Sequence, residues 1–122
     1  MILADTTIWI DHLRSHNAQM QGLLDSGQVL MHPFVVAELA LGSFRDRTGT
    51  LATLDTLLKV RVAQQSDVRR MIEIHRLYAK GIGLIDAHLI ASSLITPRTK
   101  LWTRDNALRV VATALGVDAG LP

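Results

Sequence analysis

The chain has no cysteine and few proline or aromatic residues. Its 122 residues include three Pro, two Trp, two Phe and one Tyr. The absence of cysteine excludes disulfide frameworks, zinc–thiolate sites, iron–sulfur clusters and cysteine nucleophiles. No stretch reaches the roughly 18 uninterrupted apolar residues of a membrane span. The start, Met1–Asp5, meets an acid with no basic region before it, unlike a signal peptide. We therefore expect a cytoplasmic protein with no membrane partner.

The composition is that of a globular chain. Hydrophobic residues make up 48% and charged residues 20%, and the length suits one domain over residues 1–122. The net charge is +2 and the isoelectric point about 9.5, which permits a polyanionic partner without requiring one. A mean hydropathy of +0.23 is slightly high for a free monomer and favours an apolar interface with a partner.

Short apolar runs alternate with amphipathic helical patterns along the chain. Strands are expected at 2–4, 28–31, 60–62 and 100–103, with a short stub at 117. Helices are expected at 7–13 with Thr6 or Thr7 as N-cap, at 18–24, 33–41 and 51–58, from Ser66 to Gly81, and at 85–95 and 106–115. This alternation predicts an α/β fold, a three-layer α/β/α sandwich with a short parallel sheet.

Three aspartates stand at the ends of expected elements. Asp5 follows the first strand and Asp105 follows the last, so both belong on the same edge of a parallel sheet, where ligands usually bind. Asp86 stands in the first turn of its helix, where the helix dipole favours a negative charge. Helix capping is the alternative role for each of them.

Glu38 needs a different explanation. It is one of two glutamates and interrupts the apolar helix Phe34–Leu41, which we expect to be largely buried. An unpaired buried carboxylate is costly, so Glu38 either pairs with an arginine or belongs to a site.

Convergence of Asp5, Glu38, Asp86 and Asp105 would require compensating charge. At an effective dielectric of ~20, two unit charges ~4 Å apart repel by about 4 kcal/mol. Oxygen-only ligand sets suit Mg²⁺ or Mn²⁺, and these ions assist phosphodiester hydrolysis. The pattern therefore indicates a metal-dependent nuclease.

The acids also stand in four short motifs, in order along the chain. With these motifs the sequence resembles PIN-domain proteins, specifically the VapC-type toxins of bacterial VapBC toxin–antitoxin pairs. The resemblance runs from Ile2 to Val117. The motifs are Ala4–Asp11, Val35–Leu39 followed by Gly42, Leu84–Ala91 and Leu101–Asp105.

The resemblance implies an endoribonuclease that uses Mg²⁺ or Mn²⁺, usually forms a homodimer, and is inhibited by a VapB-type antitoxin lying in its active-site groove. Asp5 and Asp86 would be direct metal ligands, and Asp105 would bind directly or through water. Glu38 would orient the attacking water or act as general base.

Three neighbouring residues complete the predicted site, and a fourth, His88, is a further candidate. By the same resemblance, the hydroxyls of Thr7 and Thr103 would hold the carboxylates in place. Arg104, next to Asp105, is the arginine with a positional argument for an RNA phosphate contact. His88 follows Asp86 by two residues and would point away from it on a helix, so its part in the chemistry stays open.

Two other classes of protein remain as alternatives. A phosphorelay receiver needs an acid pair after its first strand and a lysine after its last, where this chain has Ala4 with Asp5 and Thr103. A non-catalytic RNA- or protein-binding PIN-like module would gain nothing from a cluster of acids facing phosphates.

Overall fold

The computed structural model describes all residues, 1–122. Its centre is a three-stranded parallel sheet in the order β2-β1-β3. In this sheet Ala4, the last residue of the middle strand, lies opposite Trp102, the last residue of its neighbour. The residues that follow these two strands therefore emerge side by side. The strands are β1 (Ile2–Ala4), β2 (Val29–Leu30) and β3 (Lys100–Trp102).

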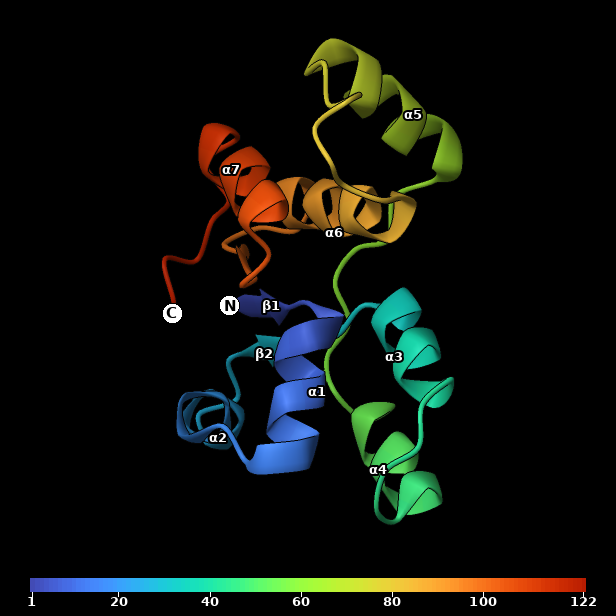
Figure 1. Cartoon of the computed structure of the whole chain (residues 1–122), viewed down its shortest axis with the longest axis vertical. Coiled ribbons are helices and arrows are strands. Elements are labelled where there is room, and N and C mark those ends of the chain that lie inside the picture. Colours follow the sequence, from blue (N-terminus) through green and yellow to red (C-terminus); the bar gives the residue numbers. More distant parts are fainter.

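Seven helices cover the sheet on both sides. Figure 1 shows α1 to α4 on one side of the strands and α5 to α7 on the other, which confirms the predicted three-layer α/β/α arrangement. No helix is long and apolar enough to cross a membrane. The helices are α1 (Thr6–Ser15), α2 (Ala18–Asp25), α3 (Pro33–Ala40), α4 (Arg47–Leu54), α5 (Gln65–Ile74), α6 (Leu84–Ile95) and α7 (Asn106–Ala114).

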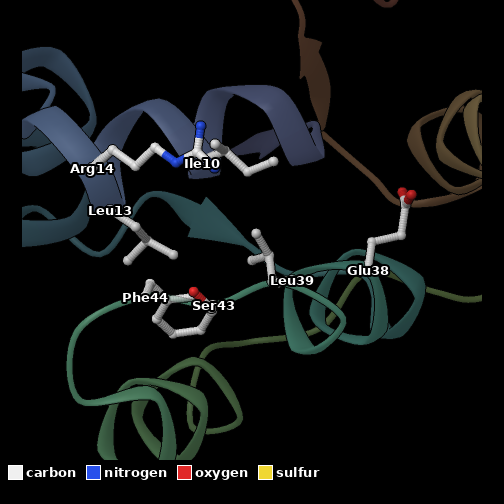
Figure 2. Close-up of a pocket in the computed structure, with 8 residues that line it drawn as sticks. Ile10, Leu13, Arg14, Glu38, Leu39, Ser43 and Phe44 are labelled. Carbon is white, nitrogen blue, oxygen red and sulfur yellow. The ribbon is translucent and has the colours of Figure 1, made fainter.

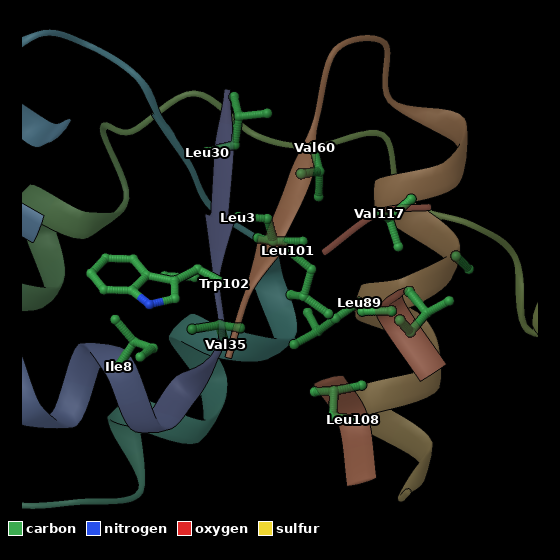
Figure 3. Packing of buried hydrophobic residues seen from close by; sticks show 14 of the residues in the cluster. Leu3, Ile8, Leu30, Val35, Val60, Leu89, Leu101, Trp102, Leu108 and Val117 are labelled. Carbon is green, nitrogen blue, oxygen red and sulfur yellow. The ribbon is translucent and has the colours of Figure 1, made fainter. Parts of the chain in front are cut away.

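The core lies on both faces of this short sheet. Successive side chains of a strand point to opposite faces, and Figure 3 shows Leu101 directed toward Leu89 of α6 while Trp102 lies on the side of Ile8 of α1. All four side chains are almost fully buried. Burial on both faces holds β1 and β3 firmly, so their carboxyl ends form a rigid base for the residues that follow.

The first helix begins differently from the prediction. The expected cap was Thr6 or Thr7, but the helix starts at Thr6 and Asp5 is its N-cap. The Asp5 carboxylate accepts the backbone N–H of Ile8 at 3.1 Å. A carboxylate at this position satisfies one of the unpaired N–H groups of the first turn, so Asp5 has a structural role as well.

The strand predicted at 60–62 does not form. Only Lys59 bridges to Met31 beside β2, and Val60 donates its N–H to the carbonyl of Met31. Val62 is 48% exposed. The apolar alternation therefore reflects one buried side chain, Val60, next to the outer strand β2.

The short strand expected at 117 appears, beside β3, as a single bridge between Leu101 and Asp118.

Two predicted helices end earlier than expected. The helix predicted at 51–58 has the same length but lies four residues earlier, at Arg47–Leu54, which leaves Leu58 65% exposed. The helix predicted to run from Ser66 to Gly81 starts at Gln65, so Ser66 does not cap it, and stops at Ile74. As a result Tyr78, which was expected on its apolar face, lies in a loop and is 57% exposed.

The expectation of a largely buried helix around Glu38 is also wrong. In α3 only Val35 and Leu39 are buried, because the helix packs on α1 and on α4 and these contacts leave part of its surface open. Phe34 is 36% exposed, and Leu41, just after the helix, is 89% exposed. An all-apolar stretch on a surface helix gives a free apolar face, which is typical of an interaction surface.

Candidate active site

The four acids of the sequence motifs border one cavity of about 290 Å³. Asp5 follows β1, Asp105 caps α7 after β3, Asp86 stands in the first turn of α6, and Glu38 comes from α3. Parallel pairing of β1 with β3 brings residues 5 and 105 together across a hundred positions of sequence. No basic side chain lines the cavity. Its other lining residues are Thr6, Thr7, Ile10, Ile85 and Leu89.

Asp5 is the most buried and the most tightly held of the four, with 5% of its surface exposed. Its Oδ1 accepts the Thr7 hydroxyl at 2.7 Å and the Ile8 N–H at 3.1 Å, and its Oδ2 accepts the Thr103 hydroxyl at 2.5 Å. A buried carboxylate needs such donors to compensate for lost hydration. Both threonines expected to hold carboxylates therefore bind the same one, Asp5.

Thr103 connects Asp5 to the second strand-end acid. While its hydroxyl donates to Asp5, the same oxygen accepts the backbone N–H of Asp105 at 3.0 Å. The Asp105 side chain then caps α7, with Oδ1 accepting the N–H of Leu108 at 2.9 Å. Its Oδ2 makes no hydrogen bond within the chain and is available at the cavity.

Asp86 is held at the start of α6 by a hydrogen bond from the Gly83 N–H to its Oδ2, 3.2 Å long. Burial raises the pKa of this carboxyl above its usual value, and the negative charges of Asp105, Asp5 and Glu38 raise it further, while the Gly83 bond works in the opposite direction. The charge of Asp86 is therefore disfavoured both by burial and by the acids around it.

Glu38 forms no salt bridge, so its pairing with a structural arginine, the alternative explanation, is wrong. Its Oε1 accepts the Thr6 hydroxyl at 2.9 Å. Thr6 is a site residue that the sequence interpretation missed, having considered it only as a helix cap. The available signal was a second hydroxyl directly after Asp5, on the turn that faces α3.

Two further candidates lie outside this arrangement. The guanidinium of Arg104 is 3.2 Å from the Asp11 carboxylate, so an RNA contact by Arg104 stays a prediction. His88 is 2% exposed, with its ring against Phe34 and its Nε2 3.0 Å from Gln65 Oε1. It does not line the cavity, in agreement with a helix that turns it away from Asp86.

The donor set suits a hard divalent cation. No group of three or more His, Asp or Glu side chains is arranged to hold an ion by itself. Mg²⁺ usually binds through one or two carboxylates and keeps several waters. Free carboxylate oxygens on Asp86 and Asp105, beside a cavity with room for water, fit that mode of binding better than a closed protein cage.

Comparison with known proteins agrees with the geometry. A model of the PIN domain matches residues 2–114. The chain belongs to the PIN-domain family. Ribonuclease VapC32 of Mycobacterium tuberculosis, found in two strains, is 38% identical to this PIN domain over 117 residues, which is 96% of this chain and 94% of the relative. The resemblance to VapC-type proteins is therefore confirmed over almost the whole chain.

The repulsion within the site of this PIN domain predicts an unusual effect on stability. Without metal at neutral pH, Asp86→Asn should raise the melting temperature by roughly 2–5 °C, because asparagine keeps the acceptor for Gly83 and loses the charge. The raised pKa of Asp86 means that the native state binds its proton more tightly than the unfolded state. This contribution is complete at low pH and is lost as the pH rises through the raised pKa.

The gain from Asp86→Asn should therefore shrink as the pH falls toward about 4, near the ordinary pKa of aspartate. Thermal unfolding in EDTA across this pH range measures it. Asp67→Asn, which removes an exposed charge on α5, serves as the control and should give no gain. A lower melting temperature for Asp86→Asn at neutral pH would contradict a repulsive cluster.

Proposed function

We propose that this chain is the toxin of a type II toxin–antitoxin pair, an Mg²⁺- or Mn²⁺-dependent endoribonuclease that hydrolyses RNA phosphodiester bonds. The observation behind this proposal is the cavity bordered by four carboxylates with no basic side chain to neutralise them. A relative over nearly the full length is named a ribonuclease, and RNA is accordingly the proposed substrate here.

The four acidic residues have two different roles in this proposal. Asp5, Asp86 and Asp105 would hold the metal, directly or through water. When bound, the metal supplies positive charge that offsets the charge developing on the phosphate. Glu38, oriented by the hydrogen bond from Thr6, takes the proton from the attacking water through a carboxylate oxygen, as a general base.

A cleavage assay with a labelled RNA tests this function. Wild-type protein should cleave with Mg²⁺ or Mn²⁺ and stop when EDTA is added. Asp5→Asn and Asp86→Asn should lower the rate by about 100-fold or more, since several kcal/mol of charge stabilisation are lost. Asp25→Asn, the same change at an exposed position on α2, should cleave like wild type.

The same assay separates the alternatives. A non-catalytic PIN-like module would bind RNA without cutting it under any of these conditions. Cleavage that survives both Asp5→Asn and Asp86→Asn would mean that the activity resides elsewhere or in a contaminant, and the proposed site would be wrong.

The proposed antitoxin site is a second cavity, which joins the carboxylate cavity. It lies between α1 and the segment after α3, and it shares Ile10 and Glu38 with the first cavity. Figure 2 shows Leu13 and Phe44 facing each other across it, with the Glu38 carboxylate at one end. An apolar segment of an antitoxin, docked here by the helix-in-groove mode, would bring a cationic side chain to the acids.

The candidate antitoxin is a small DNA-binding protein encoded beside the gene for this chain. Added in equal amount, it should suppress RNA cleavage. Phe44→Asp should raise the concentration needed for half inhibition by about tenfold or more, because it replaces the aromatic ring of the groove by a charge. Val62→Asp, at an exposed position between α4 and α5, is the matched control. Equal inhibition of both variants would contradict docking in this groove.

We also propose a homodimer in the cytoplasm, where an RNA substrate is available. Large apolar side chains are exposed on the isolated chain, among them Leu41 at 89%, Val110 at 67% and Ile74 at 66%. They stand on α5, α7 and the end of α3, and exposed apolar surface of this extent favours association. Light scattering on the purified chain should give twice the mass of one copy, and the mass of a single copy at micromolar concentration would contradict the dimer.

A further inference from the structure

The segment from Arg76 to Gly83, between α5 and α6, combines positive charge with an exposed aromatic ring. No Asp or Glu occurs between Glu73 and Asp86. Arg76 and Lys80 are exposed and form no salt bridge, and Tyr78 is 57% exposed. We call the segment Arg76–Gly83 the cationic rim. Its charges are free to bind an anion.

The cationic rim borders the carboxylate cavity. At its end, the N–H of Gly83 donates to the Asp86 carboxylate. Gly81 lies beside Ala107 in the first turn of α7, since a Cβ built on Gly81 would be 3.5 Å from the Ala107 Cβ. The rim therefore lies beside the first turn of α7, which Asp105 caps, and leads into the first turn of α6, which carries Asp86. Figure 1 shows it running from the end of α5 to the start of α6.

The rim is anchored at both ends. Arg76 has a φ of 54°, and the Leu77 N–H bonds back to the carbonyl of Ile72, which closes α5 in a Schellman motif, while the Gly83 N–H bonds to Asp86 at the other end. Leu77 itself is buried. Ala79 has a φ of 58°, a left-handed conformation that costs a non-glycine residue about 1–2 kcal/mol. This left-handed turn lies between the anchored ends and leaves Tyr78 and Lys80 exposed to solvent.

The site needs cations of this kind. Four carboxylates repel an approaching phosphate chain, and no basic side chain lines their cavity. Arg104, the nearest arginine in sequence, is paired with Asp11, and Arg14 lies in the adjoining groove on the side of Glu38. Lys80 directly precedes Gly81, which lies beside Ala107 of α7, and adjacent Cα atoms are about 3.8 Å apart. Its long flexible side chain therefore starts close to the helix that Asp105 caps, on the side from which a neighbouring phosphate would approach.

We propose that the cationic rim binds the RNA strand beside the cleavage point, with Lys80 and Arg76 on phosphates and Tyr78 stacked on an unpaired base. This assignment rests on the proposed ribonuclease function. Stacking needs a base that is free of its helix, and specific recognition of RNA mostly uses such unpaired nucleotides. The rim therefore favours single-stranded or looped RNA over a duplex.

Binding of a fluorescent single-stranded oligoribonucleotide in EDTA, where no cleavage occurs, tests the rim directly. For Lys80→Gln, the slope of log affinity against log salt concentration should decrease by about 0.7, the value for one phosphate contact on a single strand. Lys100→Gln is the matched control, because Lys100 is the first residue of β3 and so lies at the amino end of the strand, away from the acids at its carboxyl end. It should leave the slope unchanged.

Tyr78→Leu should weaken binding by about tenfold without changing the salt slope, because stacking is not ionic, whereas Tyr78→Phe should bind like wild type. In cleavage with metal, Lys80→Gln and Tyr78→Leu should raise KM and leave kcat nearly unchanged, since neither residue lines the cavity. A residue that only supports the fold would not produce this separation.

Three outcomes would contradict the proposal that the cationic rim binds RNA. Unchanged affinity and slope in Lys80→Gln and Tyr78→Leu, in a protein whose cleavage still requires Asp86, would refute the rim and leave the ribonuclease proposal intact. Wild-type protein that neither binds nor cleaves RNA would refute both. A lower oligomeric mass for Tyr78→Leu, with RNA binding unchanged, would assign this surface to a protein interface.

Discussion

The buried carboxylate of Asp5, held between the ends of β1 and β3, is the constraint on which the site depends. A charge with 5% exposure persists in a fold only when donors replace the lost water. Three donors do so here, and the hydroxyl of Thr103 is one of them because Ala4 and Trp102 are paired in register. Since Thr103 also accepts the N–H of Asp105, the same oxygen sets the relative position of two acids.

The remaining two acids approach this pair from different layers of the sandwich. Asp86 enters on α6 from one side of the sheet and Glu38 on α3 from the other. The helix dipole at the start of α6 partly compensates the charge of Asp86, and Thr6 orients Glu38. The cluster is therefore well ordered and electrostatically unfavourable at once, a combination that suits a site awaiting a cation.

Charges of opposite sign lie on separate parts of this PIN domain. All charged residues that line the cavity are acidic, whereas the unpaired cations Arg76 and Lys80 lie on the cationic rim. An apolar groove continues from the other side, by way of Ile10 and Glu38. One surface would thus present a metal site, a phosphate-binding edge and a docking groove side by side, so that a partner bound in the groove also obstructs the acids.

The local sequence determined the elements whose signals are local. Short apolar runs became the strands at Ile2–Ala4 and Lys100–Trp102, and the acids after them were assigned to one sheet edge because parallel strands end together. Four acids in the order of a known family pattern pointed to the same cavity. These features depend on the spacing of apolar residues and on the order of elements and acids along the chain, both of which can be read from the sequence.

Tertiary structure alone decided the features that depend on neighbours. Periodicity does not show which apolar face is covered, so α3 was expected to be buried and is half exposed. Helix ends depend on capping geometry, so Tyr78 was placed on a helix that in fact closes earlier through Arg76. The bond from Thr6 to Glu38 joins residues 32 positions apart, and only the packing of α3 on α1 brings those two atoms within reach.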